Sequence, residues 1–462
     1  MHVGLYIRPV LTSSIKAYVQ TYMPYFKKIT ILSFPIVIGQ LGTVLMAMAD
    51  VMMVGQLDAT NLAAVGASNA VYFLISILGI GTLTAVSPLV ARAKGASSPA
   101  DCSRYFRKGI VASLLLSVFI GFLVWVCTVY FHVFRQQPQV TELAKPYLHV
   151  LNAGTVFMLL FYAIKNFSDG VGYTKPSAII TLGGLLLNIF LNWLFIFGKW
   201  GIPEYGLLGA GIATSCTKVC MAFCMAVYVF RSKLYTVYLK AKNACIYTSH
   251  LSEVFRVGLP SGFQYFFEVA AFAAAALLIG QYGELELAAH NIAINLASTT
   301  YMAATGISAA GSILVGDAVG RKHKSDMILS GRAALMMAVV YMGFCALLFL
   351  FFPKFWIALY TTDERVAHMA VYLLMIAGLF QLSDGIQCVG VGILRGLSDT
   401  RIPTLITVVA YWAIGIPVGL WLSNSLNLSL YGIWIGLSIG LTFSAILLTL
   451  RFIKQSQRLT LV

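Results

Sequence analysis

Three carboxylic acids lie inside long apolar stretches of the sequence: Asp50, Glu268 and Asp384. About 20 helical residues cross a bilayer core about 30 Å thick, and the stretch 259–280 provides 22 residues around Glu268. An acid near the centre of such a helix costs roughly 2.5–3.5 kcal/mol on insertion scales. These acids therefore predict a site for a cation or a proton, with an internal hydrogen bond as the simpler alternative for any one of them.

Glu268 and Asp384 are predicted to reach the same depth in the membrane. Glu268 follows Arg256 by 12 residues, which is about 18 Å along a helix. Asp384 precedes Arg395 by 11 residues, about 16 Å from the same side. Two acids at one depth on different helices can share one cation, so we expect a cation-binding or coupling site at this pair, with Na⁺ as the metal candidate. Asp50 lies further along its own helix, nearer the opposite face.

A second polar site is predicted in the first half of the chain. Asn188 and Asn192 are four residues apart and share one helix face, so they could partner Asp50 in cation or proton coupling. Thr214, within a stretch of small residues, could join them. Hydrogen bonding between helices and close packing are the structural alternatives for these residues.

Side chains that suit a flat, lipophilic cation surround the acids. Methionine adapts its shape and aromatic rings attract cations, and Asp50 and Glu268 both have such neighbours. The candidates for lining a substrate cavity are Met46, Met53, Tyr265, Phe267, Phe380 and Gln381. Ordinary packing or contact with lipid is the alternative for most of them.

Other polar residues are assigned structural roles. Asp169 and Asp317 lie at the ends of apolar segments as caps or loop anchors. Lys218 is expected to face a crevice or to snorkel, and His290 to serve as a hydrogen-bonding anchor rather than a proton relay. The eight cysteines form no CxxC pair, and no GxxxxGK[ST] loop is present, so no cofactor and no nucleotide site are predicted. The energy for any transport must then come from an ion gradient or a partner.

The composition places the chain in a membrane. Hydrophobic residues make up 59% of the 462 positions and charged residues 10%, and the mean hydropathy is +0.86, which indicates a helical protein that crosses the membrane many times. Of the 31 Lys and Arg residues, 25 fall on alternate connections and five on the others. This is the positive-inside pattern, so we expect an even number of spans, both termini in the cytoplasm and no nucleic acid partner.

An internal duplication organises the chain. The stretch 34–95 aligns without a gap onto 259–320, and 15 of the 62 aligned positions are identical. The acids are not duplicated, because Glu268 aligns with Thr43 and Asp50 aligns with Ala275. With six apolar segments in each half, the halves are parallel repeats, and a cavity is expected between them.

We expect an all-α membrane protein with twelve transmembrane helices, at about 29–54, 62–91, 109–131, 147–164, 177–198, 207–230, 257–280, 287–316, 333–352, 367–394, 403–423 and 429–450. The expected divisions are a cytoplasmic N-terminal segment 1–28, an N-terminal six-helix bundle 29–230, a cytoplasmic connector 231–256, a C-terminal six-helix bundle 257–450 and a cytoplasmic tail 451–462.

Several motifs together indicate a family. They are MADVMMVG, NFSDGVGYTKP, GLLLNIFLNW, GAGIATS, FFEVAAF, AAHNIAIN, and QLSDGIQ followed by ILRGLSDT. With these motifs, residues 28–455 resemble the multidrug and toxic compound extrusion (MATE) transporters, in their NorM-like branch. The resemblance implies two six-helix bundles around a V-shaped cleft, and export of organic cations in exchange for Na⁺ or H⁺.

The resemblance also assigns residues. Glu268 and Asp384 match the cation-site acids of the C-terminal bundle. Asp50, Asn188 and Asn192 match the polar site of the N-terminal bundle. Some NorM-like relatives have Tyr four residues before the second acid, where this chain has Phe380, so a hydroxyl ligand is missing at that position.

The sequence as a whole predicts a transporter and not an enzyme. We expect a monomeric antiporter of the bacterial inner membrane that exports lipophilic, mostly cationic drugs by alternating access. A flippase for lipid-linked oligosaccharides is one alternative, and it would favour basic residues in the cavity to hold a pyrophosphate. A membrane-embedded enzyme is another, but neighbouring paired acids and HExxH motifs are missing.

Overall fold

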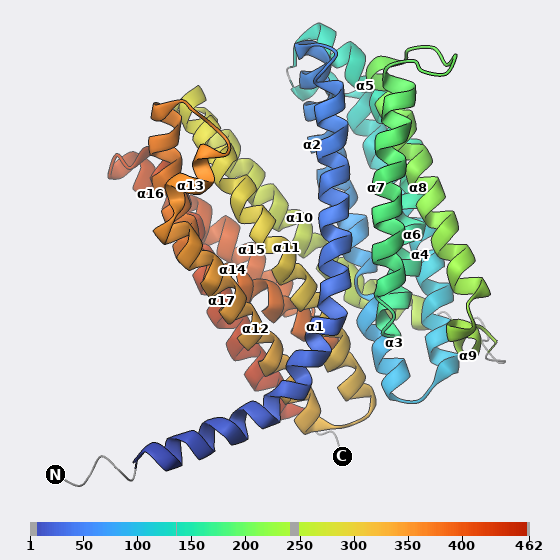
Figure 1. Ribbon diagram of the computed structural model, residues 1–462, viewed down its shortest axis with the longest axis vertical. Coiled ribbons are helices and arrows are strands. Elements are labelled where there is room, and N and C mark those ends of the chain that lie inside the picture. Colours follow the sequence, from blue (N-terminus) through green and yellow to red (C-terminus); the bar gives the residue numbers. More distant parts are fainter. Residues whose placement is uncertain (1–6, 135, 241–248, 460–462) are drawn as a thin grey trace.

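Two bundles of helices meet near one end of the molecule and diverge toward the other (Figure 1). This computed structural model describes residues 7–134, 136–240 and 249–459. Within these residues every regular element is helical and there is no strand. The predicted all-α membrane fold, with two bundles around a central cleft, is confirmed.

The first bundle contains α1 (Ile7–Val54), α2 (Ala59–Leu83), α3 (Val86–Gly95), α4 (Pro99–Val129), η1 (Phe131–Phe134), α5 (Pro138–Ala153), α6 (Thr155–Gly170), α7 (Lys175–Ile196) and α8 (Gly206–Arg231). The connection contains η2 (Lys233–Tyr235) and α9 (Thr236–Leu239). The second bundle contains α10 (Ser249–Gly280), α11 (Glu284–Gly320), α12 (Lys324–Phe351), α13 (Pro353–Ala358), α14 (Glu364–Gly396), α15 (Arg401–Val408), the π-helical segment η3 (Val409–Gly415), α16 (Ile416–Ser425) and α17 (Ser429–Arg458).

The membrane crossings agree with the predicted number. Eleven helical segments in the described residues are long and apolar enough to cross a bilayer, and the number becomes twelve when α5 and α6, which are bent by 40° at their junction, are counted as one span. The sequence predicted a single segment at 147–164 for this crossing. The bend lies at Gly154, a poor helix former, where a Cβ would come within 2.9 Å of Ser215 Oγ on α8. Glycine therefore permits both the break and the close approach of α8.

Three other predicted spans differ from the helices observed. The span predicted at 62–91 consists of α2 and α3, and the span predicted at 403–423 contains η3 between two α-helices. The first span was predicted to begin at 29, but α1 begins at Ile7 and continues through Pro24 and Pro35. Hydropathy detects only the apolar part of a helix, so it missed the polar turns at the start of α1.

The duplication is visible in where the helices begin and end. α2 begins at Ala59 and α11 at Glu284, and α3 and α11 end at Gly95 and Gly320. Both pairs differ by 225 residues, which is the offset that aligns the two halves in sequence. The two bundles therefore repeat the same helical plan in the same register.

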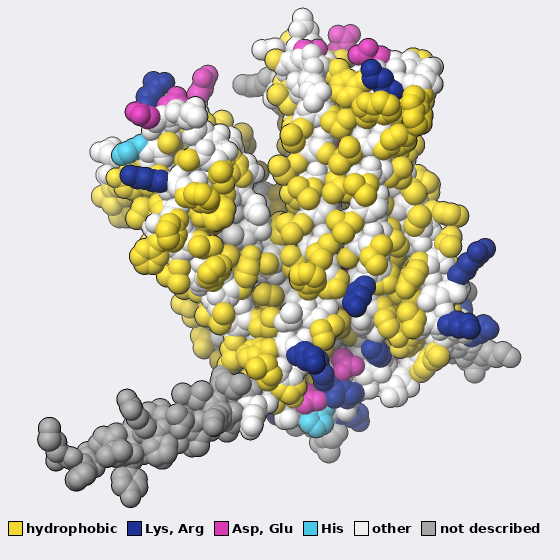
Figure 2. All heavy atoms as spheres, viewed as in Figure 1, with side chains coloured by type: hydrophobic (Ala, Val, Ile, Leu, Met, Phe, Trp, Pro, Cys, Tyr) yellow, Lys and Arg dark blue, Asp and Glu magenta, His cyan; other side chains and the backbone are white. Residues whose placement is uncertain are grey.

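Backbone contact joins the bundles at the end that holds both termini, which we call the basic end because Lys and Arg side chains gather there (Figures 1 and 2). A Cβ at Gly95 would clash with the carbonyl oxygen of Asp317, and a Cβ at Gly320 would clash with that of Arg92. These two glycines are aligned in the duplication, so α3 and α11 approach each other symmetrically. The bundles are sealed here, and the space between them lies toward the other end.

Candidate functional site

A cavity of about 420 Å³ lies between the two bundles. The first bundle contributes residues of α1, α2 and α6 to its wall, and the second contributes residues of α10, α11 and α14. Figure 2 shows the hollow between the bundles at the end away from the termini. The wall is largely apolar and aromatic, and Glu268 and Asp384 are its charged residues within the part of the chain that the structure describes.

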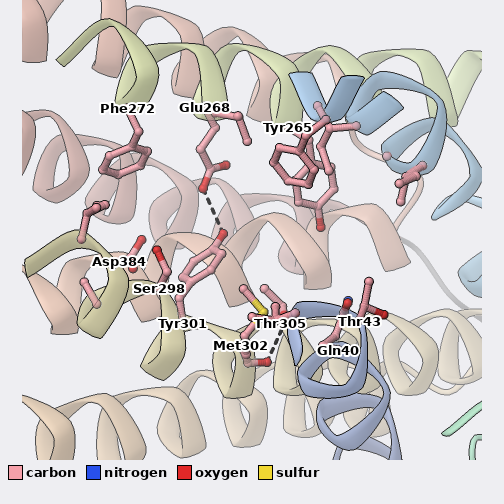
Figure 3. A pocket seen from close by; sticks show the side chains of 18 of the residues that line it. Gln40, Thr43, Tyr265, Glu268, Phe272, Ser298, Tyr301, Met302, Thr305 and Asp384 are labelled. Atoms are coloured by element: carbon pink, nitrogen blue, oxygen red, sulfur yellow. Dashed lines mark hydrogen bonds between the residues drawn. The ribbon is translucent and has the colours of Figure 1, made fainter. Parts of the chain in front are cut away.

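Glu268 on α10 points into this cavity (Figure 3), and it accepts two hydrogen bonds. Tyr301 Oη on α11 donates to Glu268 Oε1 at 2.9 Å, and Gln264 Nε2 donates to Oε2 at 3.4 Å. The side chain is buried, and no Lys or Arg of the described residues forms an ion pair with it. The donors stabilise the carboxylate without neutralising it, so a bound cation would supply the missing charge.

Asp384 on α14 faces the same cavity (Figure 3). Among the described residues it accepts no hydrogen bond and forms no ion pair, although it is only 7% exposed. The two carboxylates and the Tyr301 hydroxyl offer oxygen atoms only, which suit a hard cation or a shared proton. The described residues contain no cluster of three or more His, Cys, Asp or Glu side chains that could hold a metal.

A tyrosine hydroxyl reaches Glu268 from a helix that sequence reasoning did not consider. Phe380 lines the cavity and packs on Trp434, with ring centroids 5.7 Å apart, so the hydroxyl is indeed absent at that position. Tyr301 provides one from α11 instead. No motif marks Tyr301 in the sequence, because its role depends on how α11 packs beside α10.

Two of the six predicted cavity residues line the cavity, namely Tyr265 and Phe380. Met46 is buried within the first bundle and Met53 packs against the same core. Phe267 packs on Trp412, with ring centroids 6.4 Å apart. Gln381 is fully buried, and its Nε2 donates to Thr300 Oγ1 at 2.7 Å. These four do not line this cavity, because the helix faces that carry them turn into the bundles or toward neighbouring helices.

The polar residues predicted in the first half form one cluster. Asn192 Nδ2 donates to Asp50 Oδ1 at 2.6 Å, and Thr214 Oγ1 donates to Asp50 Oδ2 at 2.8 Å. Asn188 joins them, since its Nδ2 lies 3.4 Å from Thr214 Oγ1 and its Oδ1 accepts from Asn192 Nδ2 at 3.2 Å. The cluster lies inside the first bundle, where α1, α7 and α8 meet, and none of its residues lines the central cavity.

The residues assigned to structural roles have structural partners. Asp169 pairs with Lys165 at 2.8 Å, and Asp317 pairs with Arg321 at 2.9 Å. His290 Nδ1 accepts a hydrogen bond from Trp434 Nε1 at 3.1 Å. Lys218 donates to the Tyr72 hydroxyl at 3.0 Å and lies over its ring. None of these side chains faces the central cavity.

Arg395 is a buried cation on the basic-end side of the cavity. From the sequence, it served only to estimate the depth of Asp384 in the membrane. Its side chain is 4% exposed, and its Nε donates to Ser261 Oγ at 3.2 Å. Its guanidinium lies 5.4 Å from the ring centroid of Tyr265, a residue of the cavity wall. Arg395 Nη2 has no hydrogen-bond partner among the described residues. Ser261, the hydrogen-bond partner of Arg395 Nε, lies seven residues before Glu268 on α10, about 10 Å along the helix, so this positive charge from α14 lies on the basic-end side of Glu268.

A family assignment follows from comparison with known sequences. The sequence profile of the MatE family matches residues 35–194 and again residues 260–421. The chain belongs to the MatE family. One copy of the MatE profile thus falls in each bundle, in agreement with the duplication.

Relatives of this MatE chain carry multidrug resistance names. It is 32% identical over 441 residues to the "Probable multidrug resistance protein NorM" of Idiomarina loihiensis, covering 94% of this chain and 95% of the relative. It is 33% identical over 434 residues to a protein of the same name in Pseudomonas putida, covering 93% and 94%. It is 32% identical over 441 residues to the "Multidrug resistance protein MdtK" of Yersinia pseudotuberculosis, covering 94% and 96%. The predicted NorM-like membership is confirmed.

Solved structures share the fold of this MatE chain. The eukaryotic MATE transporter AtDTX14 matches with a TM-score of 0.86 at 20% identity, covering 95% of this chain and 98% of that one. A crystal structure described as MATE in the bent conformation matches with a TM-score of 0.87 at 22% identity, covering 95% and 97%. At these identities the likeness establishes the fold alone.

Proposed function

We propose that this chain is a multidrug antiporter, which exports lipophilic, mostly cationic compounds in exchange for Na⁺ or H⁺ by alternating access. One observation carries the proposal: Glu268 and Asp384, without a cationic partner among the described residues, lie on the wall of a largely apolar and aromatic cavity between two repeated bundles. The names of the NorM and MdtK relatives support the substrate class. The activity is transport and not catalysis, as expected for this family.

The flippase alternative receives less support from the cavity wall. A pyrophosphate-linked substrate would require basic side chains, and none of the described residues that line the cavity is Lys or Arg. Ethidium efflux from cells that express the protein, with and without a sodium gradient, tests the proposed function. If these cells accumulate as much ethidium as cells without the protein, both with and without a sodium gradient, export of this drug is excluded.

We place the protein in a bacterial inner membrane, as a monomer, with the basic end in the cytoplasm. The excess of Lys and Arg on one set of connections supports this orientation, and both termini lie at that end (Figure 1). The cavity then opens to the outside, so the structure corresponds to the state that releases drug and admits the coupling ion.

Replacing Tyr301 by Phe is expected to weaken cation binding without changing the fold. A hydrogen bond to a charged group contributes about 1.5 kcal/mol or more, so the affinity of the Glu268 site should fall roughly tenfold. The measurement is cation binding to purified protein. Tyr130→Phe removes an exposed hydroxyl at the end of α4, outside the cavity wall, and should leave the affinity unchanged. Equal affinity in both variants would mean that the Tyr301 hydroxyl does not support the site.

Replacing Arg395 by Met is expected to tighten cation binding at Glu268. If the spacing of Ser261 and Glu268 along α10 is taken as the separation of the two charges, about 10 Å, they interact by about 1.7 kcal/mol at an effective dielectric constant of 20. Removal of the buried positive charge should therefore raise the cation affinity more than tenfold. Arg256→Met makes the same change at an exposed position of α10, where water screens the charge, and serves as the control. An unchanged affinity in Arg395→Met would contradict this electrostatic account.

We propose that Asp50 handles protons or substrate exchange in the first bundle. Asp50→Asn preserves the size of the side chain but removes its charge, so drug efflux should be impaired and its dependence on external pH flattened. Asp58→Asn changes an acid outside the cluster that caps α2, where Asn caps as well as Asp, and should behave as the native protein. A fully pH-dependent, active Asp50→Asn variant would show that another group is linked to the proton.

A further inference from the structure

A second hollow, of about 490 Å³, lies on the outer side of the first bundle near the basic end. It is formed by Ile31 of α1, the turn 172–174, the start of α7 including Lys175 and Ile179, Tyr228 of α8 and Leu234 of η2. None of its lining residues belongs to the central cavity. We call this hollow the α1–α7 groove.

Three apolar side chains that line the α1–α7 groove are largely exposed. Ile179 is 69% exposed, Ile31 is 54% exposed and Leu234 is 45% exposed. α7 begins at Lys175 and α8 ends at Arg231, so the groove lies where these two helices enter the membrane. Exposed apolar side chains at this depth meet acyl chains in the bilayer.

One basic residue lines the groove, and three more lie close to its lining residues in the sequence. Lys175 is part of its wall, while Arg231 and Lys233 stand within three residues of Leu234, and Lys28 is one helical turn before Ile31. All four are exposed, and within the described residues none of them forms an ion pair. The groove is lined by no acid. A largely apolar groove with Lys175 in its wall and three further exposed cations near its lining residues in the sequence matches a molecule with an acyl chain and an anionic head.

We propose that the α1–α7 groove binds one anionic phospholipid from the leaflet at the basic end. Its phosphate would lie between Lys175 and Arg231, and one acyl chain would lie along Ile31 and Ile179. The first turn of α7 adds to the attraction, because helix N-termini favour anions. A phosphatidylcholine would match the apolar floor but would leave the excess of positive charge without a partner.

The position of the groove gives this lipid a structural consequence. α1 packs against α7 of the first bundle and against α11 of the second, so it is shared by both halves. A phospholipid seated between Ile31 and α7 would hold α1 on the first bundle. The proposal is independent of which compound or ion is transported.

The test is titration of the purified full-length protein with phosphatidylglycerol or phosphatidylcholine, with bound lipids counted by native mass spectrometry. We expect one phosphatidylglycerol to bind before the rest. Each basic residue near an anionic lipid is worth about fivefold in affinity, so Lys175→Ala should weaken this first binding about fivefold. The double variant Lys175→Ala, Arg231→Ala should weaken it about 25-fold. Ile179→Trp, a change at a largely exposed position, should fill the groove and remove the first binding event.

Lys454→Ala provides the matched control, because Lys454 is an exposed lysine of the second bundle near the same end. It should leave the first binding event unchanged. Three results would overturn the proposal: equal binding of the two lipids, equal loss in Lys454→Ala and Lys175→Ala, or full retention of the first phosphatidylglycerol in Ile179→Trp. The first two would indicate general adsorption, and the third a headgroup contact without a seated chain.

Discussion

Glu268→Gln and Asp384→Asn are each expected to abolish drug efflux while the protein remains folded and inserted. A cation 4 Å from a carboxylate gains about 4 kcal/mol at an effective dielectric constant of 20, so loss of one charge should weaken binding roughly a thousandfold. The amide keeps the size of the acid, and in Glu268→Gln the Tyr301 hydroxyl can still donate to the carbonyl oxygen of the new side chain. Resistance of cells to drugs, with the amount of protein in the membrane measured in parallel, checks this result.

An exposed acid outside the cavity serves as the control for these two variants. Glu142 on α5 is exposed, and Glu142→Gln should leave efflux unchanged. Native resistance in both cavity variants would exclude the pair as the coupling site. Loss in only one variant would show that the acids do not act as a unit.

Replacing Gly320 by Leu is expected to prevent the bundles from closing at the basic end. A Cβ there would clash with the carbonyl oxygen of Arg92 and would lie 2.9 Å from the amide nitrogen of Ala96. Backbone atoms cannot move aside as a flexible side chain can, so the cost should reach or exceed the roughly 1–3 kcal/mol typical of overpacking. The population of the closed arrangement would fall about fivefold or more, and transport would fall with it.

The opening can be measured as well as the loss of transport. Ala91 is buried with Ile36 and Ile313 where the bundles meet, so Ala91→Cys should react slowly with a thiol reagent from the basic end. Adding Gly320→Leu should accelerate the reaction. Gly183→Leu is the matched control, because a Cβ at Gly183 meets nothing within 4 Å. Slow labelling with native transport in Gly320→Leu would contradict the role assigned to the seal.

The helical plan followed from the sequence because it depends on local patterns. Apolar segments of bilayer length and the 225-residue repeat predicted the two bundles, and the i, i+4 spacing of Asn188 and Asn192 placed both on one helix face. The contact of these amides with Asp50 and Thr214 was likewise expected. The break at Gly154 was missed, since hydropathy does not register where a neighbouring helix comes close.

The cavity wall was harder to predict because it depends on how helices are rotated against one another. Met46 and Met53 lie near Asp50 in sequence, but their helix face turns into the first bundle. Tyr301 and Arg395 reach α10 from α11 and α14, so only the packing of three helices brings them to the Glu268 site. The spacing of residues in the sequence predicts which side chains are neighbours on one helix, but it does not predict which side chains on other helices contact them.

The measurement that tests the account most directly is the release of bound drug from purified protein by sodium, with potassium and choline as controls, at several pH values. An exchanger must bind drug and coupling ion in opposition. Protons compete for the same oxygens, so sodium should act at lower concentration as pH rises until both acids are ionised. We predict release that is specific for sodium and absent in Glu268→Gln. Equal release by all three salts would contradict a selective sodium site and leave the proton as the coupling ion.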